Sequence, residues 1–372
     1  MQHLNGDDLS GNSGFQGAAV TRETQLGEVI TPHMAVMTWS AAEGWHGLRV
    51  RPYGPLSLEP TASVLHYGQA VFEGLKAYRQ ADGTLAVFRP HAAARRMGAS
   101  ARRMAMPEPP EHLFLAAVDS LVEVDGSCVP DIPEVALYLR PVLFADEPAL
   151  GLRPARRYQF AVVASPASPF RTPGGRSARV WISTTFSRVA PGGTGTAKFA
   201  GNYAAGFLAQ QRAVEEGCDQ VVWLDARSHH WIEEMGGMNI FFVSDHSGRS
   251  TLITPPLGDT VLPGVTRDCV LTLAADLGYG VEERQVSVEE WRDRCADGSI
   301  SESFATGTNS GVLPIGWVRG EEGGWLVGDG GPGPVTTTLR SVLTEIQQGR
   351  RSDVHGWMHA PRSRRGTPGA PA

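Results

Sequence analysis

The stretch from Ser165 to Arg179, rich in proline and glycine, constrains the fold of this chain more than any other feature of its sequence. Pro166, Pro169 and Pro173 fall within it, and the last is followed by the pair Gly174-Gly175. Proline has no backbone N–H to donate, and consecutive glycines leave the backbone unrestrained, so helices and strands are interrupted here. We therefore predict that this stretch links two folding units.

With 372 residues, the chain is long enough for two domains, each with a buried core. We predict a smaller N-terminal domain over residues 25–165, an interdomain linker over 166–179 and a larger domain over 180–360. Residues 1–24 are polar and lack periodicity, and residues 361–372 are rich in Pro, Gly, Ser and Arg. Such composition predicts a mobile tail at the start and a disordered tail at the end.

Both halves mix strand-like and helical patterns. Runs of apolar, β-branched and aromatic residues predict strands at 136–144, 158–164, 180–186, 220–224, 239–243 and 251–254. Two periodic segments that end at a glycine predict helices over 204–216 and 266–277.

The composition excludes several classes of partner. A formal net charge of −6 gives no attraction to nucleic acid or to an anionic membrane surface. No apolar run is long enough to span a bilayer, and the polar, acidic start is unlike a signal peptide. Cys128, Cys218, Cys269 and Cys295 lie far apart without C-x-x-C spacing, so we expect reduced thiols, a cytoplasmic location and no metal site.

Lysine is almost absent from the chain. Of 33 basic residues only Lys76 and Lys198 are lysines, and the others are arginines. A coding bias from lysine to arginine is the simplest explanation for the others. Guanidinium stays protonated, however, whereas a desolvated lysine can lose its proton and attack a carbonyl. The two positions that escaped the bias are therefore candidates for chemistry that requires lysine.

Of the two lysines, Lys198 is the stronger candidate. It lies among uncharged neighbours in the glycine-rich stretch 192–203, so we expect its ammonium to be poorly solvated. The alternative is an ordinary lysine of a surface loop. Lys76 falls in a strand-like run near Glu73, and we predict a structural ion pair between them.

Two segments further along could bind a phosphate. Residues 262–267 open a predicted helix, so free N–H groups of Val265 and Thr266 would face an anion along the helix dipole. Residues 304–311 form a second glycine-rich turn with hydroxyls and exposed N–H groups. Each signal alone is weak, because many helix starts and glycine-rich turns have this composition.

Two adjacent carboxylates, Glu233 and Glu234, precede a Gly-Gly turn and an apolar strand. An isolated Glu-Glu pair is usually part of a solvated loop. Beside Lys198 and two possible phosphate sites, a buried glutamate could instead keep a proton on a pyridine nitrogen. An amine that captures an aldehyde, a phosphate site and a carboxylate for a pyridinium are the requirements of pyridoxal 5′-phosphate (PLP).

A series of short segments, in one order from about residue 33 to residue 359, carries a family resemblance. The segments include His66-Tyr67, Phe72–Arg79, Phe88–Pro90, Leu137–Pro141, Glu147-Pro148, Lys198–Tyr203, Asp219–Asp225, Glu233–Phe241, Leu262–Gly264 and Gly307-Thr308. By these segments the chain resembles the branched-chain amino acid aminotransferases of PLP fold type IV, and the bacterial type most closely. The resemblance implies an α+β fold, with a small N-terminal α/β domain, a larger barrel-like C-terminal domain and PLP between them. It also implies a homodimer in which a loop near residues 148–151 reaches the partner's pocket.

The resemblance also implies roles at the cofactor. Lys198 would be the catalytic residue that binds PLP and, once substrate displaces it, moves a proton between the substrate Cα and the cofactor. Glu234 would pair with the pyridine nitrogen, and Tyr203 would hydrogen-bond the ring oxygen. Arg96 would hold the phosphate, although a slip of one residue would give that role to Arg95. The remaining phosphate ligands would be Val265, Thr266 and Thr308.

Substrate-binding residues follow from the same resemblance. They are Tyr67, Phe72, Tyr138, Arg140, Thr308 and Asn309. Phe72 corresponds to an apolar wall, whereas Tyr138 and Arg140 correspond to residues near a substrate carboxylate. The implied reaction transfers an amino group from leucine, isoleucine or valine to 2-oxoglutarate in two half-reactions. Which arginine accepts the side-chain carboxylate of glutamate stays open.

Two departures from the family pattern bear on substrate choice. Residues 165–170 lack the tyrosine that the family carries there, and Asn309 and Ser310 replace small alanines. They raise the alternative of an L-aminotransferase for a specialised aliphatic or β-substituted amino acid. The segments around Phe72 and Glu234 disfavour a D-amino acid aminotransferase or an aminodeoxychorismate lyase. A PLP-binding domain without turnover would require a broken site, and none is visible.

Overall fold

A computed structural model describes residues 20–361 except residues 130, 133, 247 and 322. Most of the two predicted tails, residues 1–19 and 362–372, lies outside the described residues. The described end of the first tail contacts the linker, because the carbonyl of buried Thr24 accepts the Ser168 N–H at 3.0 Å.

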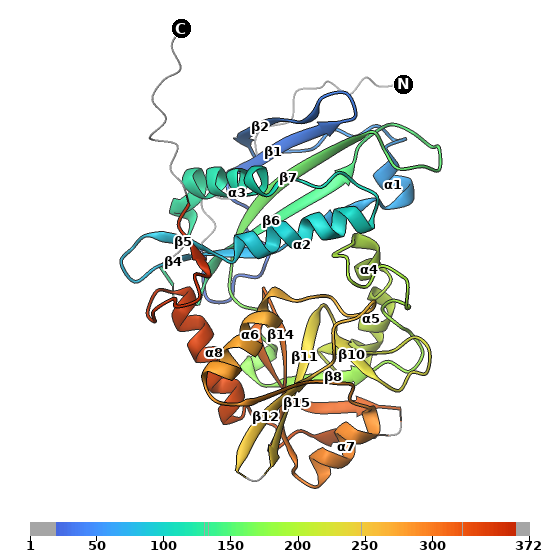
Figure 1. The fold of residues 1–372 in the computed structure, drawn as a ribbon, viewed down its shortest axis with the longest axis vertical. Coiled ribbons are helices and arrows are strands. Elements are labelled where there is room, and N and C mark those ends of the chain that lie inside the picture. Colours follow the sequence, from blue (N-terminus) through green and yellow to red (C-terminus); the bar gives the residue numbers. More distant parts are fainter. Residues whose placement is uncertain (1–19, 130, 133, 247, 322, 362–372) are drawn as a thin grey trace, which may run out of the picture.

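An antiparallel sheet forms the first layer of the structure. Its strands are β1 (His33–Ser40), β2 (Gly44–Pro52), β3 (Ala70–Phe72), β4 (Leu75–Arg79), β5 (Leu85–Phe88), β6 (Ala136–Ala145), β7 (Arg157–Ala167) and β17 (Met358–His359). The order is β17-β5-β4-β6-β7-β1-β2, with β3 paired to β6. Helices α2 (Pro90–Arg103) and α3 (Glu111–Asp125) lie across this sheet, and α1 (Ser63–Tyr67) lies near its edge (Figure 1).

Alternation along β6 separates the core of this layer from its opposite face. Leu137 and Leu139 belong to the core beneath α2 and α3. Because successive side chains of a strand point to opposite faces, Tyr138 and Arg140 lie on the other face of the sheet. Lys76 pairs in register with Tyr138 and therefore shares that face.

The second layer is a closed barrel. Its ring consists of β8 (Ala178–Ile182), β9 (Gln220–Leu224), β10 (Ile232–Met235), β11 (Met238–His246), β14 (Ile300–Gly307) and β15 (Gly311–Gly320). The ring closes because β10 pairs with both β9 and β11, so these strands expose few free edges. β12 (Arg249–Thr254), β13 (Gly280–Glu283) and β16 (Gly323–Leu326) extend it.

Side chains of β11 show how the barrel is filled and covered. Ile240 and Phe242 belong to the interior cluster, whereas Phe241 and Val243 belong to a cluster with α6 (Val265–Asp276) and α8 (Pro334–Gln347). That second cluster also contains Phe88 from the first sheet, so it joins the two layers. The remaining helices are α4 (Ala200–Ala204), α5 (Phe207–Glu215), α7 (Val288–Ala296) and the 3-10 turns Gly126–Cys128 and Pro173–Gly175.

The α+β prediction with a barrel in the second half is confirmed. Most predicted elements differ from the structure by one to three residues at an end, and three differences bear on the site. β7 continues through Pro166, where Pro166 pairs with Leu137, before the chain turns away. The strand predicted over 180–186 ends at Ile182. The helix predicted over 204–216 is split, because α4 ends at Ala204 and α5 begins at Phe207 after Gly206.

A buried carboxylate joins β14 to the start of α8. Glu302 accepts the N–H groups of Val335 and Thr336, at 2.9 and 2.8 Å, in the first turn of a helix without a side-chain cap. Replacing Glu302 with Ala should lower the free energy of unfolding by about 2–3 kcal/mol, because two buried donors lose their acceptor. Denaturant titration measures the loss.

Glu321 serves as the control for this substitution. It is exposed and accepts a single bond from Thr184, so Glu321→Ala should change the free energy of unfolding by less than about 0.5 kcal/mol. Equal midpoints for the two variants would show that Glu302 does not stabilise α8.

Candidate active site

Lys198 lies where the loop before α4 meets the first sheet. Its carbonyl accepts the Phe72 N–H at 3.0 Å, its own N–H donates to Ser100 Oγ at 2.9 Å, and the next residue forms a bridge with Val71. The main chain on both sides of Lys198 is therefore held by the first layer, through β3 and helix α2. Asn202 fixes the loop from inside, by donating to the carbonyls of Thr194 and Ala197.

The amine of Lys198 faces aromatic groups. Its Nζ donates to the Tyr203 hydroxyl at 2.9 Å and lies 4.9 Å from the ring centre of Phe72. The rings of Phe72 and Tyr203 meet edge to face, 4.8 Å between centres. No carboxylate among the described residues forms an ion pair with this amine. The arrangement suits an amine that is to react at a carbonyl carbon.

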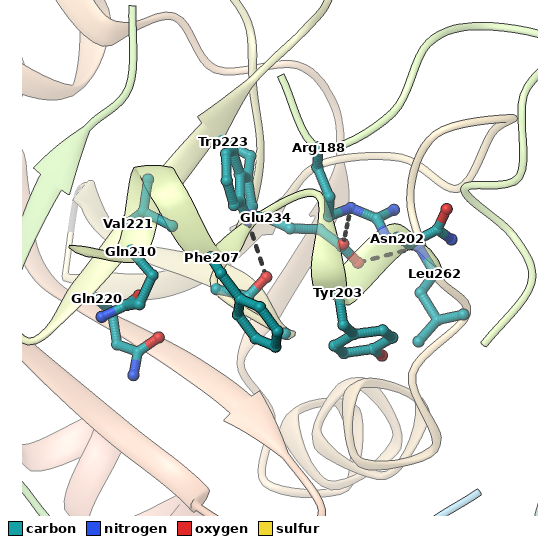
Figure 2. Close-up of a pocket in the computed structure, with 13 residues that line it drawn as sticks. Arg188, Asn202, Tyr203, Phe207, Gln210, Gln220, Val221, Trp223, Glu234 and Leu262 are labelled. Atoms are coloured by element: carbon teal, nitrogen blue, oxygen red, sulfur yellow. Dashed lines mark hydrogen bonds and ion pairs between the residues drawn. The ribbon is translucent and has the colours of Figure 1, made fainter. Parts of the chain in front are cut away.

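Glu234 is buried on β10, where it forms an ion pair with Arg188 and accepts two hydrogen bonds. Its Oε2 lies 2.7 Å from Arg188 Nε, and its Oε1 accepts the Leu262 N–H at 3.0 Å (Figure 2). The same Oε1 accepts a hydrogen bond from Asn239 Nδ2 at 3.1 Å. Burial raises the pKa of Glu234 to about 7, although Arg188 and the Leu262 amide act in the opposite direction. The carboxyl thus sits near its midpoint at neutral pH, and a cation placed beside it would favour the ionised form.

Arg188 is a site residue that the sequence did not reveal. It is buried and forms an ion pair with Glu234, and its Nη2 donates to the carbonyls of Gly195 and Thr260. Both carbonyls flank the site, one in the loop before Lys198 and one before α6. In a chain whose basic residues are nearly all arginine, neither rarity nor a local motif marks this position.

Arg96 belongs to α2, and its side chain reaches the start of α6, where a phosphate ligand is expected. Its Nε and Nη2 each donate to Glu73 at 2.7 Å, and its Nη1 donates to the Pro263 carbonyl at 3.2 Å. Gly264 follows as the N-cap of α6 without a side-chain cap, so the first N–H groups of the helix remain available to an anion. Arg95 points elsewhere, is largely exposed and lies 3.9 Å from Glu111.

The N–H groups of α6 are brought to the β14–β15 turn. Val265, Thr266 and Thr308 line one small cavity together. Gly264 allows this approach, because a Cβ there would lie 1.9 Å from Asn239 Oδ1. Since Asn239 also bonds to Glu234, the proposed phosphate site and the buried carboxylate depend on the same amide.

Phe72, Tyr138 and Arg140 gather on the face of the first sheet that looks toward the barrel. The guanidinium of Arg140 lies 4.9 Å from the ring centre of Phe72 and 5.3 Å from that of Tyr138, and its Nη2 donates to the Tyr138 hydroxyl at 3.3 Å. Arg140 Nε is buried and has no acceptor among the described residues. A half-buried guanidinium with a donor to spare suits a carboxylate ligand.

Two expectations at the edge of the site turn out differently. The predicted ion pair between Lys76 and Glu73 is wrong, because Glu73 is bonded to Arg96 and Lys76 Nζ donates to the Asn309 carbonyl at 3.0 Å. Tyr67 is 42% exposed and donates to the Leu150 carbonyl, at a distance from this cluster along the sheet edge. The structure thus unites the other predicted residues but leaves Tyr67 on the surface of this subunit.

Phe207 and Trp223 border a cavity of about 230 Å³ beside Glu234 and Tyr203. Figure 2 shows the carboxylate of Glu234 directed to Arg188 and the Leu262 amide at its rim. No group of three His, Cys, Asp or Glu side chains in the described ranges could hold a metal ion. A search of the same residues finds no helix long and apolar enough to cross a membrane.

The donor set fits PLP on observations from this structure. An amine bonded to a phenol, a buried carboxyl with a pKa near 7 and an uncapped helix start beside a buried arginine correspond to its aldehyde, ring nitrogen and phosphate.

Comparisons with known proteins agree with this geometry. Residues 70–317 match the model of the amino-transferase class IV family. The chain is 50% identical over 344 residues to the branched-chain-amino-acid aminotransferase of Mycobacterium tuberculosis, covering 92% of this chain and 94% of that protein. The branched-chain amino acid aminotransferase of Escherichia coli superposes with a TM-score of 0.72 at 25% identity, covering 87% and 98% of the two chains. The branched-chain aminotransferase of the archaeon Thermoproteus uzoniensis with norvaline gives 0.70 at 26%, covering 88% and 100%.

The buried carboxyl predicts how the stability of the cofactor-free protein depends on pH. The pKa of Glu234 is 4.5 in an unfolded chain and about 7 in the folded one, so the folded state holds this proton more tightly. The extra stability of the folded state that comes from this proton is complete below about pH 4.5 and is lost as the pH rises through 7. The free energy of unfolding of Glu234→Gln, minus that of wild type, should therefore rise by about 2–3 kcal/mol between pH 4.5 and 8.

Denaturant titrations of both cofactor-free proteins across that range measure the difference. The lost contact with Arg188 contributes a constant offset, so only the slope with pH reports the titration of Glu234. A difference that stays flat would mean that Arg188 keeps the carboxylate ionised throughout.

Proposed function

Because the chain belongs to the class IV aminotransferases and, within them, to the branched-chain-amino-acid aminotransferases, we propose that it uses PLP to exchange amino groups between leucine, isoleucine or valine and 2-oxoglutarate. The observation that carries the proposal is the Lys198 amine, which is bonded to Tyr203 and flanked by Phe72. The buried Glu234 and the start of α6 supply the other two groups that the cofactor needs.

Each part of the cofactor has a proposed partner. Lys198 takes the aldehyde carbon, Tyr203 the ring oxygen and Glu234 the ring nitrogen. The phosphate is held by Arg96 and by the residues at the start of α6 and in the β14–β15 turn, namely Val265, Thr266 and Thr308. PLP, when bound, withdraws electrons from the substrate α-carbon, so that the α-proton becomes acidic.

The protein's own groups then move that proton. Once the amino group of the substrate replaced it at the cofactor, Lys198 Nζ would take the proton from the substrate Cα and return it at the carbon that carried the aldehyde. Tyr203 is within hydrogen-bond distance of this amine and would fix its direction. Ionised Glu234 would hold a proton on the ring nitrogen of PLP and so favour the withdrawal of electrons by the ring. Arg188 contacts Glu234 Oε2, the oxygen that does not bond to Leu262, and stabilises the ionised carboxylate.

Substrate recognition is proposed to use the face formed by Phe72, Tyr138 and Arg140. The ring of Phe72 offers an apolar wall to an aliphatic side chain, and Arg140 Nε offers a donor to a carboxylate. One pocket must accept leucine in one half-reaction and glutamate in the other. An arginine stacked on aromatic rings can serve both, because its planar faces are less hydrated than its edge.

A second candidate is an L-aminotransferase for a specialised aliphatic or β-substituted amino acid. It is favoured by Asn309, in the turn next to Thr308, because the buried Oδ1 of this residue has no hydrogen-bond partner in the part of the chain that the structure describes. A polar group on the donor could satisfy this atom. A panel of amino donors that includes leucine and β-substituted analogues separates the two candidates.

We further propose a homodimer. The elements α1, the β6–β7 connection and α5 lie on one side of the subunit (Figure 1), and each carries large apolar side chains that are exposed. They are Leu65, Leu150, Leu152, Phe207 and Leu208. Exposed apolar patches of this kind mark interfaces. The β6–β7 connection is bonded to α1, since Tyr67 donates to Leu150, so the loop 148–151 is presented in an ordered form to the partner's site.

The remaining features of the proposal concern location and domains. The four cysteines are free, consistent with a reducing cytoplasm, and amino and 2-oxo acids are the proposed partners, without nucleic acid or membrane. The division near residues 166–179 is proposed to separate the two domains, with the active site between the first sheet and the barrel.

Removing the amine of Lys198 tests the central assignment. Lys198→Ala should lower transamination of leucine by at least about 10³-fold, because proton transfer loses its base. The absorbance of added PLP should no longer show capture by a lysine. Steady-state rates and visible spectra measure both effects. Lys198→Arg is the matched control for charge and should be equally inactive, and turnover in either variant would contradict the assignment.

A charged residue in the exposed loop tests the dimer. Leu152 is 89% exposed in the subunit, and Leu152→Asp should shift the protein from dimer to monomer and lower its activity. Val354 is 77% exposed near the other end of the chain, and Val354→Asp should leave both properties unchanged. Analytical ultracentrifugation measures the mass. A dimer that tolerates Leu152→Asp as well as Val354→Asp would contradict the proposed interface.

A further inference from the structure

We propose that Lys76 is a positioning residue of the substrate pocket, which acts by holding the β14–β15 turn against the interdomain linker. The inference rests on the proposed function, since the turn carries Thr308 and Asn309. Lys76 itself lies on β4, and its amine contacts the turn by a hydrogen bond to one carbonyl oxygen, that of Asn309.

That carbonyl, of Asn309, accepts two hydrogen bonds. Lys76 Nζ donates to it at 3.0 Å, and the Phe170 N–H donates at 3.1 Å. Three segments that are far apart in the sequence thus meet at one oxygen: strand β4, the linker and the β14–β15 turn. Phe170 packs against the barrel interior, so the linker end of this junction is anchored. Lys76 provides the link from the junction to the first sheet.

The surroundings of Lys76 explain why a lysine is suited to this position. The side chain is buried, 3% exposed, and among the described residues no carboxylate forms an ion pair with it. Burial lowers the pKa of Lys76 to about 7, and Glu134 opposes the shift. Glu134 is itself paired with Arg171 and, at 3.7 Å, with Arg340. A neutral amine can donate to the carbonyl without a buried charge, whereas an arginine would stay charged.

The turn that Lys76 holds contacts both parts of the proposed site. Thr308 lines one cavity with Val265 and Thr266 at the start of α6, and Lys76 lines the same cavity. On its other side the turn is fixed by Ser310 Oγ, 3.1 Å from Met238 Sδ. Without the Lys76 bond the turn is no longer tied to the first sheet, while its contacts through Phe170 and Ser310 remain. The substrate wall should tilt while the cofactor residues on β10 and α4 stay in place.

Lys76→Met tests the inference, because it keeps the length and apolar character of the side chain and removes the donor. The ratio of kcat/KM for leucine to kcat/KM for glutamate should change by about 10-fold or more, since the two side chains meet the wall differently. A readout independent of turnover is the Kd of the PLP-loaded enzyme for 4-methylvalerate and for glutarate. Their ratio should change in the same direction.

Arg79→Met is the matched control. Arg79 lies on the same strand, and its Nη2 donates to the Val129 carbonyl at 2.7 Å, away from the site. Its loss should lower thermal stability and leave both ratios at the wild-type value. Should Lys76→Met not fold, Lys76→Gln is measured by the same criteria, with a smaller change in ratio expected because an amide donor remains.

The outcomes separate this inference from the proposed function. A wild-type enzyme that transfers no amino group from leucine would overturn the function itself. With an active wild type, leucine-to-glutamate ratios that Lys76→Met and Arg79→Met leave equally unchanged would overturn the positioning role of Lys76 and reduce it to a structural residue.

Discussion

A short main-chain contact between the two layers determines where chemistry can occur in this protein. The Phe72 N–H donates to the Lys198 carbonyl, and Val71 and Phe199 form a bridge beside it. Through these bonds the end of β3 holds the residue that carries the amine, while the barrel and α4 hold the rest of the loop. Backbone contacts do not depend on rotamers, so the main chain of Lys198 is placed at the junction by the fold itself, and the bond to Tyr203 then directs the amine. Phe72 then lies beside it as a consequence of the same pairing.

Closure of the barrel fixes the position of Glu234, as the contact with β3 fixes the main chain of Lys198. β10 is paired on both sides, so the strand that carries Glu234 cannot slide by one residue without moving β9 and β11. The carboxyl is then fixed further by Arg188, Asn239 and the Leu262 amide. Rigid support of this kind is what a buried ionisable group requires, because a loose arrangement would leave it solvated or unpaired.

Local patterns in the sequence predicted a good part of this arrangement, and tertiary contacts account for the rest. Strand periodicity located β6 and β9, and family motifs pointed to Lys198 and Glu234, which lie close enough to interact electrostatically. The break between α4 and α5 was missed, because Ala204 to Gly206 carries no strong stop signal. The partners of Glu73 and Glu234 were also missed. An ion pair between Arg188 and Glu234 joins positions 46 residues apart, and no spacing rule reaches across a barrel.

The scarcity of lysine takes on a physical meaning once the surroundings of both lysines are compared. An arginine can replace a lysine wherever a positive charge on the surface is needed, and this chain has accepted that exchange almost everywhere. The two lysines that remain both lie at the junction of the layers, one bonded to Tyr203 and one to the Asn309 carbonyl. Neither makes an ion pair with a carboxylate among the described residues. On the proposed assignments, both positions need a primary amine. At Lys198 the amine would bond to the aldehyde of the cofactor, and at Lys76, where burial lowers the pKa to about 7, it can donate to a carbonyl without a buried charge. Guanidinium can do neither, so the same chemical limit accounts for both exceptions.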